Sequence, residues 1–296
     1  MDRGSELADF LRTRRARVTP DTAGLPPDAR PRRVPGLRRD EVARLARVST
    51  EYYTRLEQGR ARNPSPEVVE ALAEALRLDH SEREHLGNLL ARPARGAARR
   101  APAGPQRVRP GLRMTLAALE RIPAFVIGRR TEVLATNRLA REVMTDFEAL
   151  PAKQRSLARY LLLDPEARRR VVEWERGASE TVAMLRLEAG RHPHDRLLTD
   201  LVGELMVRSP EFGDWWHDHR VLRRTHGLKR YRHPLVGDLT FHYESFPVAG
   251  ESDQTLCVYN VEPDSETARA LNLLGDWTAT PRPRRAPDER TDPAEA

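Results

Sequence analysis

Two short amphipathic helices with almost no loop between them are the feature that most limits how this chain can fold. They are predicted within RRDEVARLARVSTEYYTRLEQGRARNPSP, residues 38–66. Val42 and Ala43 point inward from the first helix. Tyr53 and Leu56 point inward from the second, which Ser49 is placed to cap. This spacing is typical of a helix-turn-helix, whose second helix presents a polar face to the major groove of DNA.

The outward side chains of the second helix are polar and suit contact with base edges. Arginine pairs with guanine O6 and N7, glutamate accepts from cytosine N4, and threonine meets a base edge or a thymine methyl group. The predicted base contacts are Thr50, Glu51, Tyr52 and Arg55. Contacts to phosphates position a protein without reading sequence. Those predicted here, at the ends of the two helices, are Arg38, Arg39, Ser49, Arg60, Arg62 and Asn63.

The distribution of charge agrees with a polyanion partner. The 296 residues carry a formal charge of +7, and residues 1–100 hold 21 Arg against 15 acidic residues. Nearly all of the positive excess therefore lies in the N-terminal third of the chain, which contains the helical pair, as expected of a nucleic-acid-binding module. The alternative is a protein–protein interaction module that uses the helical domain without binding DNA.

Two segments rich in Ala, Arg and Pro divide the chain. Residues 91–107 have almost nothing to bury and are predicted to be a linker. Residues 278–296 have the composition of a disordered tail. We therefore expect a helix-turn-helix domain over residues 1–90 and a second domain over residues 108–277.

The N-terminal domain is predicted to be all-α. A first helix runs from about Glu6 to Arg17, a fourth begins at Pro66, and Ser81 with Glu84 predicts a capping box that opens a fifth. The stretch between the first two helices, residues 18–36, contains five prolines and is irregular. Its arginines, at positions 30, 32 and 33, either reach a neighbouring groove of DNA or are solvated.

The C-terminal domain is predicted to be α+β. Five antiparallel strands, with helices on one face, are expected over residues 124–129, 131–136, 228–234, 238–248 and 255–263. Between the second and third strands lies a long helical insertion, in which residues 165–190 are expected to form one continuous helix.

Alternating apolar residues on these strands predict a ligand pocket. Each strand offers one apolar face to the helices, although for any single residue ordinary core packing is the favoured explanation. The predicted wall residues are Phe125, Ile127, Leu134, Leu161, Trp174, Phe241, Tyr243 and Tyr259.

Residues 5–90 resemble the DNA-binding domain of phage-repressor-like (XRE) helix-turn-helix regulators. The resemblance rests on R38-R39-D40-E41-V42-A43, on Y52-Y53-T54-R55-L56-E57-Q58-G59-R60 and on N63-P64-S65-P66. It implies that Glu57 pairs with Arg15 of the first helix. Arg47 is the departure, since that family usually has glycine there, in a left-handed conformation that costs other residues on the order of 1 kcal/mol. We expect the corner to persist with mild strain and Arg47 to gain a phosphate contact.

Residues 108–277 resemble the MmyB-like regulator ligand-binding domain, and the strand-strand-helix EVLATNRLAREVM resembles the opening of PAS domains. The matching phrases include PAFVIGRRTEVLATNRLAR, HPHDRLLTDLVGEL and KRYRHPLVGDLTFHYE. The resemblance implies a small apolar, acyl-like ligand, a fatty acid being the best candidate. The insertion from Phe147 to Arg220 is longer than in a plain PAS domain, so the cavity is expected either between sheet and helices or within the helical block.

Other functional classes find little support. No phosphate-binding loop, dinucleotide motif or nucleophile elbow is present, so no enzyme and no cofactor are predicted. The histidines of HPHD and WWHDHR are not expected to bind a metal, and Asp195 is expected to cap a helix. A single cysteine, Cys257, and the lack of a membrane-spanning run or signal peptide predict a cytoplasmic protein. A homodimer is expected, because one recognition helix rarely buries enough surface for specific binding.

Overall fold

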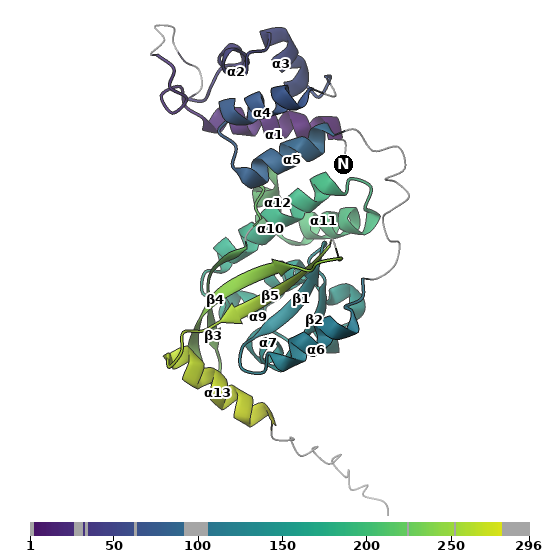
Figure 1. The fold of residues 1–296 in the computed structure, drawn as a ribbon, viewed down its shortest axis with the longest axis vertical. Helices are drawn as coiled ribbons and strands as arrows, with labels where there is room; N and C mark the ends of the chain where they lie inside the picture. Colours follow the sequence, from purple (N-terminus) through teal and green to yellow (C-terminus); the bar gives the residue numbers. More distant parts are fainter. Residues whose placement is uncertain are drawn as a thin grey trace, which may run out of the picture.

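The computed structural model describes residues 3–26, 32, 35–61, 64–91, 106–223, 225–251 and 253–279. The segments predicted to be linker and tail lie almost entirely outside these ranges. Two units are stacked along the long axis of the molecule, a purely helical one above and one built on a sheet below (Figure 1). None of the described helices is long and apolar enough to cross a bilayer.

The N-terminal unit is all-α, as predicted. Serine caps begin two of its helices: the Ser49 side chain accepts a hydrogen bond from the Tyr52 amide, and Ser65 accepts one from the Val68 amide. The helices are α1 (Arg3–Arg17), α2 (Arg39–Leu45), α3 (Thr50–Glu57), α4 (Pro66–Ala75) and α5 (His80–Leu90).

The start of α5 differs from the prediction. Its capping box is made by Asp79 and Glu82, not by Ser81 and Glu84. Aspartate caps a helix as well as serine does, and both pairs have the same spacing, so the sequence allowed either register. Ser81, which is buried, and Glu84 are thereby left to contact residues of the C-terminal unit.

The corner between α2 and α3 has the predicted packing. Val42, Ala43, Ala46, Tyr53 and Leu56 are all buried in the core of the N-terminal unit. This core fixes the angle at which α3 leaves α2.

Arg47 adopts the left-handed conformation that glycine favours, with φ of 55°. The chain closes around it: the Arg47 amide donates to the Arg44 carbonyl (3.2 Å) and the Val48 amide to the Ala43 carbonyl (2.9 Å). These two hydrogen bonds form a Schellman motif at the end of α2. The predicted strain is therefore present, and the cap together with the buried core holds the corner in place.

The C-terminal unit contains one five-stranded antiparallel sheet in the order β2-β1-β5-β4-β3. The α+β prediction is confirmed, with each strand within a few residues of its expected position. The strands are β1 (Ala124–Gly128), β2 (Val133–Thr136), β3 (His226–His233), β4 (Gly237–Pro247) and β5 (Gln254–Asn260).

Most helices of this unit cover one face of the sheet and share its larger core. They are α7 (Arg138–Val143), α8 (Leu157–Leu163), α9 (Pro165–Arg170), α10 (Trp174–Arg191), α11 (Arg196–Arg208), α12 (Pro210–His217) and α13 (Glu266–Ala279), with 3₁₀ turns at Phe147–Ala149 and Ala152–Gln154.

The prediction that helices cover one face only is wrong. Helix α6 (Pro110–Ala118) lies against the opposite face, where Leu112 and Leu116 pack with Val126 and Val258. Both faces of β1 are therefore buried. For this reason the alternation of residues along β1 does not distinguish side chains that face the larger core from side chains that face solvent.

The single helix expected over residues 165–190 is broken between α9 and α10. Val171 forms a β-bridge with Tyr231, and the Val172 amide donates to the Arg230 carbonyl (3.0 Å). Because β3 is an edge strand of the sheet, its backbone is available to accept this pairing. A long-range contact thus overrides the helical pattern at these residues.

We predict that Arg47→Gly raises the free energy of unfolding by about 1 kcal/mol, because glycine adopts a positive φ without a steric penalty. Arg44→Gly, within α2, is the matched control and should lower the same quantity by about 0.5–1 kcal/mol. Urea unfolding measures both. A lower melting temperature for Arg47→Gly would contradict the strain at this corner.

Candidate DNA-binding face and ligand cavity

Helix α3 lies at the end of the molecule far from the sheet (Figure 1). The side chains of Thr50, Glu51 and Arg55 are exposed, as a surface that meets base edges requires. Tyr52, the fourth predicted base contact, is only half exposed and packs partly against the core. The first three residues therefore form the accessible centre of the face, and Tyr52 lies at its border.

The predicted phosphate contacts divide into three groups. Arg60 and Ser49 are exposed, and Ser49 also caps α3 through a hydrogen bond from the Tyr52 amide (3.1 Å). Arg38 is half exposed at the start of α2. Arg62 and Asn63 lie outside the described residues.

Arg39 has a structural contact that the sequence did not indicate. Its Nε donates to a carboxylate oxygen of Glu57, and Arg15 Nε donates to the other oxygen at 2.8 Å. The expected Glu57–Arg15 pair is therefore confirmed, with Arg39 as a second partner. Since the Glu57 side chain is 1% exposed, these two bonds satisfy a charge that would be costly to bury alone. They tie α3 to both α1 and α2.

The proline-rich stretch before α2 is anchored at one described residue. Arg32 donates to Glu41 at 2.5 and 3.2 Å, and the Arg38 amide donates to the same carboxylate at 2.7 Å. The hydrogen bond from Arg32 is the main reason that the pKa of Glu41 lies below its usual value. Arg32 is thus held on α2, whereas positions 30 and 33 lie outside the described residues.

A cavity of about 260 Å³ lies between the sheet and helix α10. This volume is near the lower end of the range for small-molecule sites, about 300–1,000 Å³. Of the predicted wall residues, Phe125, Ile127, Leu161, Tyr243 and Tyr259 line it. The cavity is therefore found between sheet and helices, not within the helical block.

Three predicted wall residues do not line this cavity. Leu134 packs on the opposite face of the sheet, beside α6. Trp174 packs against Trp215, and its indole nitrogen donates to the Leu161 carbonyl at 2.6 Å. Phe241 is enclosed by Tyr231 and Tyr259, with ring centroids 6.0 and 5.5 Å away. All three stabilise the core around the cavity.

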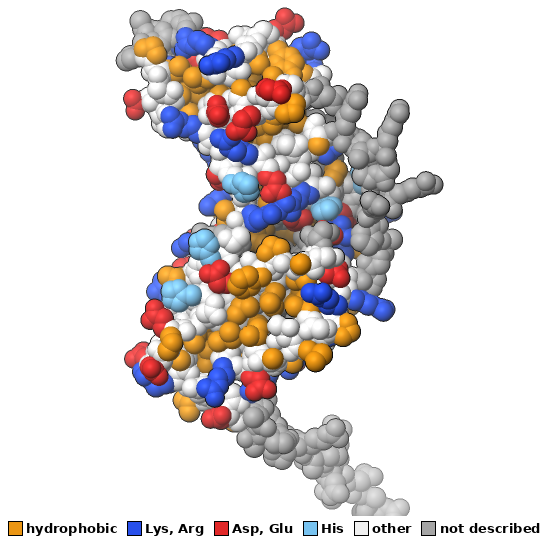
Figure 2. Space-filling model, in the orientation of Figure 1, with side chains coloured by type: hydrophobic (Ala, Val, Ile, Leu, Met, Phe, Trp, Pro, Cys, Tyr) orange, Lys and Arg blue, Asp and Glu red, His pale blue; other side chains and the backbone are white. Residues whose placement is uncertain are grey.

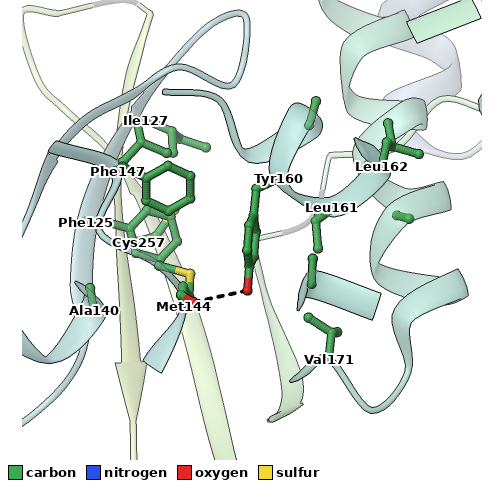
Figure 3. Packing of buried hydrophobic residues seen from close by; sticks show 14 of the residues in the cluster. Phe125, Ile127, Ala140, Met144, Phe147, Tyr160, Leu161, Leu162, Val171 and Cys257 are labelled. Atoms are coloured by element: carbon green, nitrogen blue, oxygen red, sulfur yellow. Dashed lines mark hydrogen bonds between the residues drawn. The ribbon is translucent and has the colours of Figure 1, made fainter. Parts of the chain in front are cut away.

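The sequence missed several residues of the cavity wall. Figure 3 shows Phe125, Ile127 and Cys257 on the strand side, with Leu161 and Val171 across from them on the helical side. The apolar residues that were not predicted come from segments far apart in the chain and include Leu157, Val171, Met184, Leu187, Leu222, Tyr231 and Cys257. Alternation along strands could have identified Tyr231 and Cys257, but nothing local indicates that the others meet there.

The chemistry of this wall favours a ligand with an apolar body. Tyr231 and Tyr259 place their hydroxyl oxygens 3.3 Å apart inside it, and burial raises the pKa of Tyr231 to about 12. Burial also raises the pKa of the Cys257 thiol to about 12, which leaves it a neutral, unreactive wall group. These groups remain uncharged at neutral pH, so the part of the wall that they form is neutral, whereas the Glu180–Lys229 ion pair also lines the cavity.

The two units meet through charged groups that are largely buried. Figure 2 shows charged side chains and histidine gathered at the waist of the molecule. Arg186 of α10, only 1% exposed, forms an ion pair with Glu6 of α1 and stacks over the Trp216 ring, 4.2 Å from its centroid. Its Nη1 also lies 3.0 Å from His219 Nδ1.

His85 of α5 completes this contact as a neutral group. Its ring is fully buried and meets Phe10 edge-on at 5.1 Å, and burial lowers its pKa to about 3. Burial would by itself raise the pKa of Glu6, but His219 and the charge of Arg186 together lower it to about 2. The ionised Glu6 carboxylate is therefore part of the link between the units at neutral pH.

The other histidine motifs have structural roles. Asp195 caps α11 by accepting from the Leu198 amide at 3.2 Å, as expected, and His217 bonds to the Gly213 carbonyl. His219 lies beyond the end of α12. In the part of the chain that the structure describes, no three His, Cys, Asp or Glu side chains are grouped as metal ligands.

The architecture defines a ligand-sensing regulator that binds DNA through a helix-turn-helix. Two family comparisons agree with it: residues 6–86 match the family described as "Helix-turn-helix domain", and residues 108–274 match "MmyB-like transcription regulator ligand binding domain". Because the second match covers more than half of the chain, the protein belongs to the MmyB-like transcription regulators. Neither family is one of enzymes. No curated protein matches the sequence.

We predict that the Glu6 carboxylate stabilises the protein above pH 4.5 and that this contribution is lost as the pH falls toward 2. The reason is that its pKa is about 2 in the folded chain and near 4.5 when unfolded. Glu6→Gln should therefore lower stability by a few kcal/mol at pH 6 and by much less at pH 2.5. Urea unfolding at both pH values measures this difference.

Asp9→Asn is the matched control, because it removes an exposed carboxyl from the same helix. Its effect should be below about 0.5 kcal/mol at either pH. A Glu6→Gln effect of equal size at both pH values would contradict the assigned role of the charge.

Proposed function

We propose that α3 reads operator DNA by entering the major groove with Thr50, Glu51 and Arg55 against base edges and Tyr52 at the border. The exposure of these polar side chains on a rigidly held helix is the observation that carries this proposal. Rigidity comes from the Ser49 cap and from the buried Glu57 carboxylate, which ties α3 to Arg15 and Arg39. A recognition helix must be held in this way for its side chains to meet particular bases.

Phosphate contacts are assigned to groups around that face. Arg60 and Arg47 are exposed at the ends of the pair. Arg39 keeps 48% of its side chain exposed while it pairs with Glu57, so it has both a structural and a phosphate-binding role. The remaining assignments are Arg38, Ser49, Arg62 and Asn63.

The chain acts on DNA as a homodimer in this proposal. One helix-turn-helix covers a single half-site, and specific binding requires more buried surface than one recognition helix provides. Two copies related by a two-fold axis would place their α3 helices in successive major grooves of a palindromic operator.

The ligand is proposed to be a small apolar molecule with an acyl chain, such as a fatty acid. Support comes from the aromatic and aliphatic wall between sheet and α10, whose tyrosines and cysteine stay neutral. A ligand regulates only through its difference in affinity for two states of the protein. We assign those states to different placements of the helix-turn-helix unit relative to the sheet unit.

We predict that Arg55→Ala reduces the preference for operator over random duplex by about 10- to 100-fold, because one bidentate base contact is worth about 1–3 kcal/mol. Arg60→Ala is the matched arginine control and should weaken both duplexes alike, lowering the slope of log affinity against log salt by about 1. Fluorescence anisotropy at two salt concentrations measures both, with a duplex enriched from a random pool by the wild-type protein.

Two results would contradict the DNA proposal. Equal losses on operator and random duplex for both variants would remove the distinction between base and phosphate contacts. A wild-type protein with no steep salt dependence on random duplex would favour the alternative, an interaction module that binds a protein partner.

We predict that protein purified from its natural host carries a fatty-acid-sized adduct in native mass spectrometry. Met184→Trp should abolish that adduct, because a tryptophan at this position of α10 fills the cavity. Arg208→Gln, on the exposed side of α11, is the control that keeps it. An adduct retained by Met184→Trp would place the ligand elsewhere.

A further inference from the structure

The ligand cavity and the contact between the two units share one wall. Leu187 of α10 lines the cavity and is also part of the core of the N-terminal unit. The segment after α12 is shared in the same way: Val221 lies in that core, whereas Leu222 and Arg223 line the cavity. A molecule that moves this wall therefore directly shifts the surface against which the helix-turn-helix unit packs.

Two cavity residues hold α5 by their charge. Arg191 Nε donates to Glu84 at 2.9 Å, and its Nη2 contacts the same oxygen. Arg223 Nη2 lies 3.4 Å from that oxygen, and its amide donates to Ser81 Oγ at 3.0 Å. A single carboxylate of the N-terminal unit is thus bound by two arginines that face the cavity.

This end of the cavity has an unbalanced charge without Glu84. Its lining residues include three arginines, at positions 129, 191 and 223, but only two carboxylates, Glu188 and Asp253. At the far end, Glu180 and Lys229 lie 3.8 Å apart and balance each other. Glu84 does not line the cavity, yet it supplies the missing negative charge.

Arg129 adds an incompletely bonded donor at this end. Its side chain is 3% exposed, and Nε lacks a hydrogen-bond acceptor among the described residues, with Asp195 3.8 Å away. Asp253 is 3.5 Å from its Nη2. A buried donor of this kind is stabilised by an added acceptor.

The aromatic residues of the cavity and its three arginines lie toward different ends of β1. Phe125 pairs with Cys257 at one end of β1, whereas Gly128, next to Arg129, pairs with Gln254 at the other. The C-terminal end of α10 lies at the second end, because His192 is 3.8 Å from Asp253. A ligand with its chain among the aromatic residues would bring its head group to the arginines.

We propose that the ligand carries an anionic head group, which takes the place of Glu84 at Arg191 and Arg223 and thereby releases α5 from the sheet unit. This inference rests on the proposed ligand site and adds the charge of the ligand and its route of regulation. Ligand and Glu84 compete for the same guanidinium groups, so occupancy of the cavity and docking of the helix-turn-helix unit oppose each other. By linkage, undocking of the helix-turn-helix unit strengthens ligand binding by the same factor by which ligand binding favours undocking.

The test uses decanoate and its methyl ester as probes of the full-length protein. Calorimetry should show decanoate binding at least about tenfold more tightly, since only the acid carries the charge that the arginines bind. Hydrogen exchange followed by mass spectrometry should show faster exchange in α1 and α5 with decanoate than with the ester at equal occupancy.

Two variants undock the N-terminal unit by different means. Glu84→Gln removes the competing charge. Gly190→Ala acts by shape, since a methyl group there would lie 2.6 Å from the buried His85 ring, and Gly190 does not line the ligand cavity. Both should speed exchange in α5 without ligand and raise decanoate affinity several-fold. Arg208→Gln, on α11, should change neither.

The outcomes separate this inference from the proposed function. If acid and ester bind equally, or if Glu84→Gln leaves decanoate affinity and α5 exchange unchanged, the competition is refuted while the acyl site stands. If neither probe binds the wild-type protein, the acyl-ligand proposal fails and this inference fails with it. Tighter binding of decanoate to both variants, with faster exchange in α5, supports the competition.

Discussion

The buried ion pair between Arg186 and Glu6 is the interaction on which the arrangement of the molecule depends. A guanidinium with 1% of its side chain exposed requires partners. Here they come from α1, from Trp216 and from His219, two residues beyond α12. Removing one partner from such a group leaves a charge that the interior does not tolerate. Arg186 and its partners must therefore separate in one step when the two units come apart. Such a contact has two defined states, docked and undocked.

Helix α10 connects the chemistry of the ligand site with the position of the DNA-binding face. It carries Arg186 at the contact, Met184 in the cavity wall and Leu187 in both. Interfaces packed in this way switch between discrete arrangements more readily than they deform gradually. In the regulation that we propose, a ligand that acts on α10 changes where α3 is held without touching α3 itself.

Local sequence predicted the features that depend on neighbouring residues. The inward positions of α2 and α3 follow from the spacing of their apolar residues. The left-handed corner at Arg47 and the pairing of Glu57 with Arg15 were expected from the family resemblance instead. Of the eight predicted wall residues, five line the cavity. Leu134 does not, because α6 covers the other face of the sheet.

The remaining features depend on contacts between distant segments. The break at Val171 needs the edge of β3, sixty residues away in the chain, and Arg191 meets Glu84 across two domains. Neither residue has a local pattern that indicates its partner. The partner of Arg39 could not be predicted from local sequence either. An arginine at the start of a helix beside other arginines is compatible with a phosphate contact and with an ion pair alike.

The central claim is that the exposed face of α3 lies against bases in the DNA complex. Photocrosslinking tests it most directly, with a photoreactive residue placed at the position of Glu51 or, as control, at the exposed position of Glu175 in the sheet unit. The account predicts crosslinks to operator duplex from the first position only, mapped to bases within a half-site. Absence of crosslinks from position 51, or equal yields from both positions, would contradict it.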